Sequence, residues 1–397
     1  MKKLVSVILI LVMLAATPMA LAADPIKLGL ISSLSGALQD YGDQFRKGFL
    51  LGLEYQTNGT NEVAGRLVEL IWEDTTNTPD VAKERTLKLL DQDKVDMVIG
   101  YASSGDAVAC LPLFEEFETV CIVEPAAADT VLSANNWNPY VFRTGRTSGQ
   151  DALGMAAMLK EAAQPGDKVA IFGPDTTFGY SMAEPFAKAL EGSGLEVMAP
   201  EYAPQDASDF TPYILRIKEA QPQYLYVIWA GANSPWKQMM EHDLSAAGIT
   251  ICTGTPDLAQ LRGMNELAGS DALGVSIYYY TAVPENAMNE FLVKEHLERF
   301  GVQPDFFTCG GFAAAVAFTT AMEKTNGVTD PAVLIPALEG MEFETPSGTR
   351  WFRPEDHQAI QPLFQIRYID EGLDHPVPEL LRVLDAELVA PGILNAQ

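Results

Sequence analysis

The sequence is poor in the residues that build metal centres. It has four cysteines and four histidines among 397 residues, and none of them shows the paired Cys-x-x-Cys or His-Glu-x-x-His spacing of a zinc site. The histidines, His242, His296, His357 and His375, lie in polar stretches that we expect to be exposed. We therefore expect no metal ion, no cofactor and no catalytic histidine.

The few cysteines leave disulfide formation open. Cys110 falls in a predicted helix and Cys121 in the strand that follows it. An oxidising compartment would permit a local bridge between them, and the pattern allows this as readily as two free thiols. Cys252 and Cys309 fit the pattern of small buried apolar residues.

Basic residues are also scarce. The chain has 26 Lys and Arg against 53 Asp and Glu, which gives a formal net charge of -27. Such a surface repels nucleic acid and anionic lipid, so we expect neither as a partner. The hydrophobic content of 48% is typical of a well-packed globular protein.

Complete catalytic motifs are missing as well. There is no phosphate-binding loop, and residues 179–183 lack the closing glycine of a nucleophile elbow. The glycines of residues 192–194 follow a predicted helix, which favours a helix C-cap over a dinucleotide-binding loop. A secreted hydrolase that uses Ser104 or Ser181 as nucleophile is therefore the weaker alternative to a binding protein.

The most informative feature that is present lies at the N-terminus. Two lysines precede an apolar run over residues 4–16, and residues 20–22 form a small-x-small site. The run is too short for a comfortable membrane span. We predict a signal peptide over residues 1–22, cleaved near Ala22, and an exported periplasmic mature chain. No cysteine follows the cleavage site, so we expect no lipid anchor.

Beyond the leader, short apolar runs alternate with segments of helical period. In the first predicted helix, Phe45, Phe49, Leu50 and Leu53 share one face. This alternation, over a length too great for one ordinary core, predicts an α/β protein with parallel sheets flanked by helices. The predicted strands are 26–34, 67–73, 95–100, 119–123, 169–173, 195–198, 224–229, 249–253, 274–280 and 361–368, and the predicted helices are 45–54, 81–90, 107–117, 151–161, 182–190, 209–219, 286–299 and 312–324.

The pattern restarts after residue 145 without a flexible linker. We therefore expect two lobes between which the chain passes more than once. The first lobe is predicted to comprise residues 23–143 plus 277–350, and the second residues 144–276 plus 351–397.

Small polar residues gather where the predicted strands of the first half end, which is where open α/β sheets bind ligands. Ser103 and Ser104 open a helix, and free backbone N–H groups with serine hydroxyls suit a carboxylate. The alternative is that these serines only cap the helix. Residues 126–128, all alanine, follow the next strand and would let backbone groups approach a ligand.

The second half contributes two aromatics and one acid at its strand ends. Phe178 and Trp229 can close over an apolar or flat ligand, although many aromatics are only core. Asp257 can pair with a ligand ammonium, or it can serve as a helix N-cap.

Several segments together resemble the periplasmic branched-chain amino-acid (Leu/Ile/Val) binding proteins, which are the substrate-binding subunits of ABC importers. The resemblance covers essentially the whole mature chain. It implies the type I periplasmic binding fold, two Rossmann-like lobes joined by three crossovers, with hinge closure over the ligand. It also implies an ABC permease as membrane partner and a monomeric state. The segments are 26–36, 41–44, 100–105, 125–127, 140–144, 178–179 and 353–358.

The resemblance also implies roles for individual residues. Tyr41 would line the mouth of the site, and Ser104 would hydrogen-bond the ligand carboxylate. The carbonyl of Ala126 would accept from a ligand ammonium, which Asp257 would pair. Arg146, near the first crossover, fits either a carboxylate contact or a hinge salt bridge.

Three departures from the family pattern bear on specificity. Ala128 stands where these receptors usually carry a hydroxyl residue, Phe178 replaces a tyrosine, and Trp229 is bulky for a leucine site. We therefore expect an exported solute-binding protein, without catalysis of its own, that takes an apolar amino acid or an aromatic acid. The alternative is a sensor of the same fold for an amide, urea or an amino acid.

Overall fold

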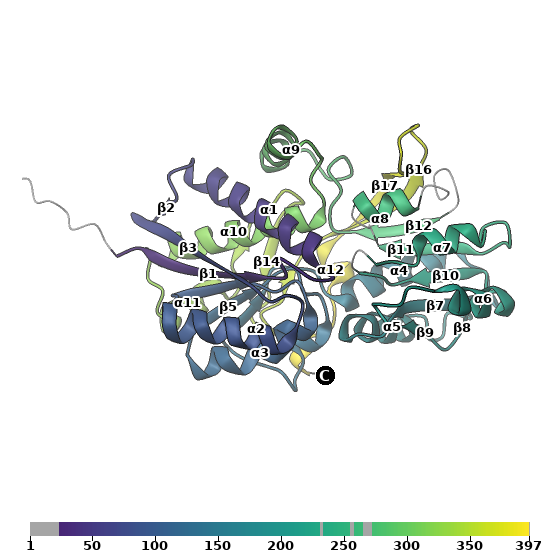
Figure 1. The fold of residues 1–397 in the computed structure, drawn as a ribbon, viewed down its shortest axis with the longest axis horizontal. Helices are drawn as coiled ribbons and strands as arrows, with labels where there is room; N and C mark the ends of the chain where they lie inside the picture. The colour runs from purple at the N-terminus through teal and green to yellow at the C-terminus, as the bar shows by residue number, and fades with distance from the viewer. Residues whose placement is uncertain (1–23, 231–232, 255–257, 265–271, 397) are drawn as a thin grey trace, which may run out of the picture.

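The computed structural model describes residues 24–396 apart from 231–232, 255–257 and 265–271, and it shows two α/β lobes side by side (Figure 1). The first lobe is built on a sheet with the order β2-β3-β1-β4-β5-β6, in which all neighbours are parallel except the β2–β3 hairpin. The strands are β1 (Ile26–Ser32), β2 (Glu62–Val63), β3 (Arg66–Asp74), β4 (Met97–Gly100), β5 (Val120–Val123) and β6 (Val141–Arg143).

Helices cover both faces of this sheet. Along β1, Leu28 and Leu30 pack in the cluster that contains α1 and α10, whereas Ile31 faces the cluster of α2 and α3; this is the period of two of a strand buried on both sides. The helices are α1 (Gln39–Thr57), α2 (Pro79–Leu87), which continues as the π-helix η1 (Lys88–Asp93), α3 (Ser104–Glu116), the 3-10 helix η2 (Asp129–Leu132), α9 (Ala287–Phe300), α10 (Phe306–Lys324) and α11 (Pro331–Leu338).

Helices α1 and α10 approach each other closely. A Cβ atom at Gly48 would lie 1.9 Å from the carbonyl oxygen of Thr308, so glycine is required there. Phe45, Phe49 and Leu53, spaced by four, are buried, but Leu50 is 44% exposed. The expectation that Leu50 shares this face was wrong, because one residue further along a helix turns the side chain away by about 100°.

Helix α10 is long and apolar enough to cross a membrane, but it is mostly buried inside the first lobe. It is therefore a core helix of the protein.

The second lobe is built on a sheet with the order β17-β16-β12-β11-β10-β7-β8, with β9 also paired to β7. Strands β16 and β17 run antiparallel to their neighbours at one edge. The strands are β7 (Lys168–Pro174), β8 (Glu196–Val197), β9 (Glu201–Ala203), β10 (Tyr224–Val227), β11 (Thr250–Gly254), β12 (Leu273–Ser276), β16 (Leu363–Ile369) and β17 (Val377–Leu384), and the helices are α4 (Ser148–Ala162), α5 (Thr177–Ala189), α6 (Thr211–Ala220), α7 (Trp236–Glu241), α8 (Leu258–Gly263) and α12 (Ala386–Val389).

The chain passes between the two sheets at residues 144–147, 277–286 and 361–362, as the three expected crossovers require. Buried side chains tie these passages together. Arg143 Nε donates to Gln358 Oε1 at 2.6 Å, and Gln358 Nε2 donates to the carbonyl of Gly145 at 2.7 Å. A small sheet of β13 (Glu342–Phe343), β14 (Arg350–Phe352) and β15 (Ala359–Ile360) precedes the third passage.

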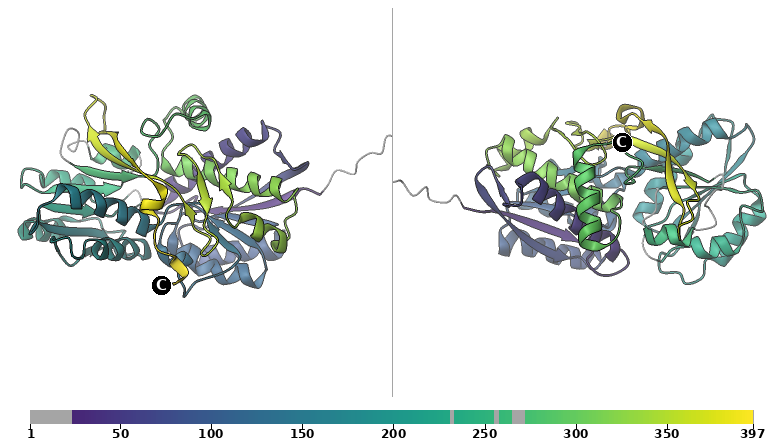
Figure 2. Two further views of the ribbon diagram at one scale, coloured as in Figure 1. Left: turned by 180° about the vertical axis from the view of Figure 1, so that it is seen from behind. Right: turned by 90° about the horizontal axis from the view of Figure 1, so that it is seen from above.

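The C-terminal segment runs along the second lobe and then ends beside the first (Figure 2). It closes with the 3-10 helix η4 (Leu394–Ala396), where Leu394 packs in the α2–α3 cluster of the first lobe. This end differs from the predicted boundary, which gave residues 351–397 as a whole to the second lobe. An amide of the last turn explains the return, because Leu394 N–H donates to the buried Asp356 carboxylate at 2.9 Å.

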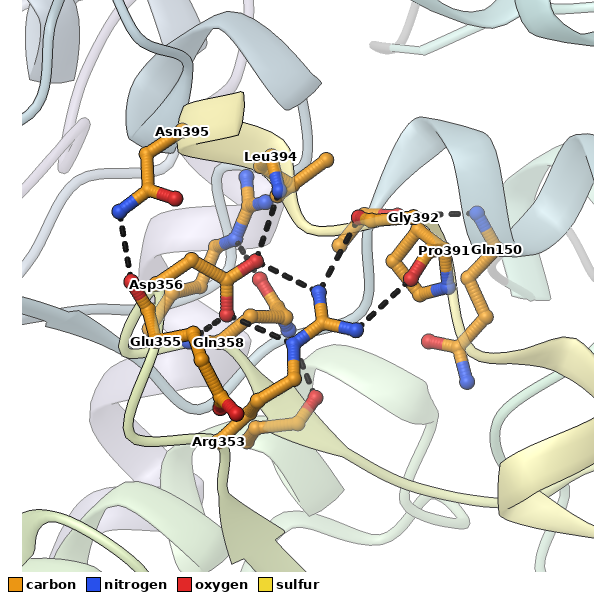
Figure 3. A network of polar contacts seen from close by, with 12 residues as sticks. Gln150, Arg353, Glu355, Asp356, Gln358, Pro391, Gly392, Leu394 and Asn395 are labelled. Carbon is orange, nitrogen blue, oxygen red and sulfur yellow. Dashed lines mark hydrogen bonds and ion pairs between the residues drawn. The ribbon is translucent and has the colours of Figure 1, made fainter. Parts of the chain in front are cut away.

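Asp356 lies at the centre of a polar network that fixes this tail (Figure 3). Arg353 Nε and Nη2 donate to its two carboxyl oxygens at 2.8 and 2.5 Å. Arg353 Nη1 also donates to the carbonyl of Pro391 at 2.8 Å. The side chain of Asp356 is fully buried, so this bidentate pair is shielded from solvent.

The cysteines and two of the histidines differ from the sequence-based picture. All four cysteines are buried free thiols, so a Cys110–Cys121 bridge is not formed. His296 and His357 are buried rather than exposed. The Nδ1 of His296 lies 2.8 Å from the Val302 carbonyl, and His357 stacks on Phe142 with ring centroids 3.8 Å apart, contacts that flanking charged residues do not reveal.

Candidate ligand-binding site

A cavity of about 330 Å³ lies between the lobes. Its walls come from the carboxyl ends of β4, β5, β7, β10, β11 and β12, and from helices that begin there. Both sheets thus present to this one cavity the edge at which α/β sheets bind ligands. A cavity of this size matches a small molecule.

On the first-lobe side, the turn from β4 into α3 places two serines. Ser103 caps α3, and its Oγ accepts from the N–H of Asp106 at 3.3 Å. Ser104 lines the cavity, and its Oγ accepts from the N–H of Ala128 at 3.1 Å. That bond uses the oxygen of Ser104 as an acceptor, so its hydroxyl hydrogen can be donated to a ligand.

The three alanines after β5 lie differently from one another. Ala127 lines the cavity, whereas Ala126 and Ala128 are buried behind it. Arg143 Nη1 donates to the carbonyl of Ala128 at 2.7 Å and contacts that of Ala126 at 3.5 Å. Arg143 therefore competes with a ligand ammonium for the carbonyl oxygen of Ala126. The bond from the ligand to this carbonyl stays a prediction.

On the second-lobe side, aromatic side chains form the wall. Phe178, in the first turn of α5, and Trp229, after β10, both line the cavity. The indole of Trp229 packs edge-on against Phe210, with centroids 5.0 Å apart. Its Nε1 donates to the carbonyl of Asn233 at 2.7 Å, which fixes the orientation of the ring. These two rings give the second-lobe side of the cavity an aromatic surface.

A second row of aromatics lines the cavity at the start of α10; the sequence predicted Tyr41 but not Phe306 and Phe307. Tyr41 stacks on Phe307 at 3.8 Å between centroids, and Phe307 lies 3.9 Å from Phe306. The helix was predicted to begin at residue 312. Asp305 is the signal that was overlooked, because its carboxylate accepts from the N–H groups of Phe307 and Thr308 as an N-cap.

Arg146 extends this row with a positive charge. Its guanidinium carbon lies 5.1 Å above the ring of Phe306, and its Nε donates to Asp151 Oδ2 at 2.5 Å. Both Arg146 and Asp151 line the cavity. Burial raises the pKa of Asp151, and the neighbouring Arg146 opposes that shift. The structure therefore shows the salt bridge, and it places Arg146 on the cavity wall, where the contact with a ligand carboxylate stays a prediction.

Hydrogen bonds between helix residues of the two lobes include one at the cavity wall and one away from it. Gln260, from α8, lines the cavity and donates from Nε2 to the phenol oxygen of Tyr41 at 3.0 Å. On another side, the N–H of Asp129 donates to Ser181 Oγ at 2.7 Å. Asp257, the predicted ammonium partner, lies outside the described residues.

The site offers no arrangement for hydrolysis in the part of the chain that is described. Ser181 contacts Asp129 of the other lobe, and no histidine is among the described residues that line the cavity. Within the same ranges, no group of three histidine, cysteine or acidic side chains is placed to hold a metal ion.

The chain belongs to the periplasmic binding protein family, whose model matches residues 25–372. It is a solute-binding protein of the ABC-transporter type, with the type I periplasmic binding fold. The resemblance inferred from the sequence is thereby confirmed.

Individual proteins support this assignment. A crystal structure described as an ABC-type branched-chain amino acid transporter from Rhodopseudomonas palustris CGA009 is 37% identical, covers 94% of this chain and 100% of its own, and superimposes with a TM-score of 0.79. The Leu/Ile/Val-binding protein homolog 6 of Brucella abortus is 26% identical over 94% of this chain and 95% of its own. A solute-binding protein from R. palustris BisB5, solved with 3,4-dihydroxybenzoic acid, shares the fold at a TM-score of 0.82 and 24% identity, with coverage of 94% and 99%.

Proposed function

We propose that this protein captures a small carboxylate-bearing ligand, an aromatic acid or an apolar amino acid, between its lobes and delivers it to an ABC permease. The observation that carries the proposal is the composition of the cavity wall. A guanidinium, that of Arg146, stands at the end of a stack of aromatic rings, and the Ser104 hydroxyl lies on the same lobe edge.

The cation and the hydroxyl suit a carboxylate. Arg146 uses Nε for Asp151, and no hydrogen bond from its terminal nitrogens is found among the described residues. Two parallel bonds from a guanidinium to a carboxylate are shorter and stronger than neutral hydrogen bonds. Asp151 and the Phe306 ring hold the guanidinium in place, so little side-chain freedom is lost on binding.

The aromatic walls favour a flat ligand. Phe306 and Phe307 on one side and Phe178 and Trp229 on the other can sandwich a ring in offset or edge-on geometry. The similar protein from R. palustris BisB5 was solved with an aromatic acid, whereas the similar proteins of Brucella are named for leucine, isoleucine and valine. We place aromatic acids first and apolar amino acids second.

The proposal includes the route and form of the protein. Residues 1–22 would act as the export signal and be removed near Ala22, and the mature protein would work in the periplasm as a monomer. The lobes would correspond to residues 23–143 plus 277–350 and to residues 144–276 plus 351–397, apart from residues 351–360, which precede the third passage, and the returning tail. The protein would bind its ligand without turnover.

A thermal-shift and calorimetry panel tests the ligand class. Mature protein, refolded to remove carried-over ligand, would be tested with benzoate, 4-hydroxybenzoate, leucine, phenylalanine, benzamide and urea. Ligand at a hundredfold above its Kd adds about 2.7 kcal/mol, which raises Tm by several degrees. A shift with benzoates but not with benzamide supports the proposal, and a shift with benzamide or urea alone would contradict it.

A further inference from the structure

One buried acid at the cavity has no role in the site described so far. Asp106, in the first turn of α3, is fully buried and is one of the residues around the cavity. Neither of its carboxyl oxygens has a hydrogen-bond partner of good geometry in the described part of the chain. A buried carboxylate without such partners is costly, so this group needs an explanation.

The surroundings of Asp106 offer hydroxyls rather than charges. Ser103 of α3 and Thr75 after β3 are the polar groups beside it, and Thr75 is hydrogen-bonded to Ser33 Oγ at 3.1 Å. The thiol of Cys110 lies further along α3. The exposed Lys83 of α2 interacts electrostatically with that thiol. Burial raises the pKa of Asp106 to about 6, and the two hydroxyls only partly oppose this shift.

Asp74, the acid at the end of β3, already has hydrogen-bond donors. Asp74 accepts from the N–H groups of Leu34 and Ser35 and from the Ser35 hydroxyl. These bonds hold the pKa of Asp74 below its ordinary value, although burial opposes them. Asp106 is therefore the acid of this corner that changes charge near neutral pH.

Asp106 also occupies the helix end at which a ligand carboxylate is expected. Ser104 lies two residues before it, and the start of α3 can stabilise one negative charge through its N–H groups and dipole. A second carboxylate brought to the same buried end would repel the first at short range. Like charges that share a site cannot both remain ionised at neutral pH.

We propose that binding of a carboxylate ligand in this cavity is coupled to uptake of a proton by Asp106. The proposal rests on the proposed function, because it requires the ligand to be an anion. Asp106 is then a positioning residue that tunes affinity through its charge. The protonated acid would no longer repel the ligand, and its O–H could be donated to the neighbouring hydroxyls.

The coupling has a definite sign. A ligand that raises the pKa of Asp106 binds more tightly as pH falls, until Asp106 is protonated in the free protein as well. Between pH 8 and pH 6, the Kd of benzoate should fall on the order of tenfold. Benzoate itself does not titrate in this range, since carboxyl groups in water ionise near pH 4.

Isothermal titration of wild-type protein with benzoate, in buffers of different ionisation enthalpy, counts the protons directly. At pH 7 we expect uptake of roughly half a proton or more per ligand. Asp106→Asn should take up none, should bind benzoate with a Kd independent of pH, and at pH 8 should bind at least as tightly as wild type. If Asp106 had a merely structural role, Asp106→Asn would instead weaken benzoate binding at every pH.

The matched control is Asp80→Asn, which removes an exposed acid from the first turn of the neighbouring helix α2 and should retain the wild-type proton count. Asp106→Ser also removes the charge, and it replaces Asp106→Asn if that variant folds poorly. Benzoate binding by wild type without proton uptake, or equal uptake by Asp106→Asn, would overturn the coupling and leave the proposed function standing. If no carboxylate bound at either pH 5.5 or pH 8, the coupling and the proposed function would both be overturned.

Discussion

The phenol of Tyr41 in the first lobe accepts a hydrogen bond from the side-chain amide of Gln260 in the second, at 3.0 Å. The same phenol ring stacks on Phe307, so one side chain joins the aromatic wall of the cavity to the opposite lobe. Both residues are nearly buried. The group that joins the two lobes therefore also lines the cavity between them.

Tyr41→Phe should weaken ligand binding without changing the fold. Loss of the hydroxyl removes the bond to Gln260 but keeps the stack on Phe307, so the cost should be about 0.5–1.5 kcal/mol, most of it in a faster dissociation rate. Stopped-flow fluorescence with benzoate measures this rate. Tyr55→Phe, on the same helix but packed against Phe291, is the control. Equal rates for Tyr41→Phe and wild type would argue against a role in closure.

Arg146→Gln should change which ligands bind. Removal of the guanidinium should weaken benzoate at least tenfold, because a charge-assisted bond is worth about 1.5–3 kcal/mol, and should leave any affinity for benzamide unaltered. Titration calorimetry of both ligands gives the ratio. Arg216→Gln, which breaks an exposed pair with Glu201, should leave both affinities as they are. A parallel loss for acid and amide would show that Arg146 acts only on the fold.

Ser104→Ala should weaken carboxylate binding by about 1–3 kcal/mol, because one charge-assisted bond is lost. The structure adds a cost in stability, since the buried N–H of Ala128 would lose its acceptor. We expect the free energy of unfolding to fall by about 1–3 kcal/mol. Calorimetry and urea unfolding measure the two effects separately. An unchanged Kd would remove Ser104 from the site.

Asp356→Asn should be the most destabilising of these substitutions. It breaks the buried bidentate pair with Arg353 and removes the carboxylate that accepts from Leu394, which costs about 3–5 kcal/mol. Urea denaturation monitored by tryptophan fluorescence measures the loss. Glu379→Gln, in an exposed pair with Arg367, should cost less than about 1 kcal/mol. Similar losses for the two variants would mean that the tail network contributes little.

The four thiols should be unreactive in the native protein. Burial raises the pKa of Cys110 to about 11, so little thiolate forms at neutral pH, and all four side chains are buried. Ellman's reagent should detect four thiols after unfolding and almost none before it, and reductant should not move the Tm. Detection of only two thiols in unfolded protein would reveal a disulfide.

Much of the fold could be predicted from the sequence because its strands are continuous apolar runs. The run that became β1 and the helix that contains Phe45 and Phe49 were recognisable by period alone. Strand β17 was missed, because exposed Leu381 and Val383 on an edge strand leave no clean alternation of buried and exposed positions. The return of the tail rests on contacts of Asp356, which no local pattern encodes.

The site was only half predictable for a similar reason. The positions of four residues on the cavity wall could be predicted, because strand ends can be located from the sequence and ligands bind at strand ends. These residues are Ser104, Ala127, Phe178 and Trp229. Residues carried by helices that arrive from distant parts of the chain were not found. Phe306, Phe307 and Gln260 reach the cavity only through packing and the passage between lobes.

Two of the hydrogen bonds that join the lobes have a consequence for signalling. Gln260 to Tyr41 and Asp129 to Ser181 are made entirely by protein atoms, so they lower the free energy of the closed arrangement whether or not a solute is bound. The hinge closure expected from the family would then be a pre-existing equilibrium that the ligand shifts, and these bonds would reduce the free energy that the ligand must supply. A permease that recognised only the closed shape would then also bind some protein that carries no solute. The strength of these two bonds would then set the fraction of ligand-free protein that is closed.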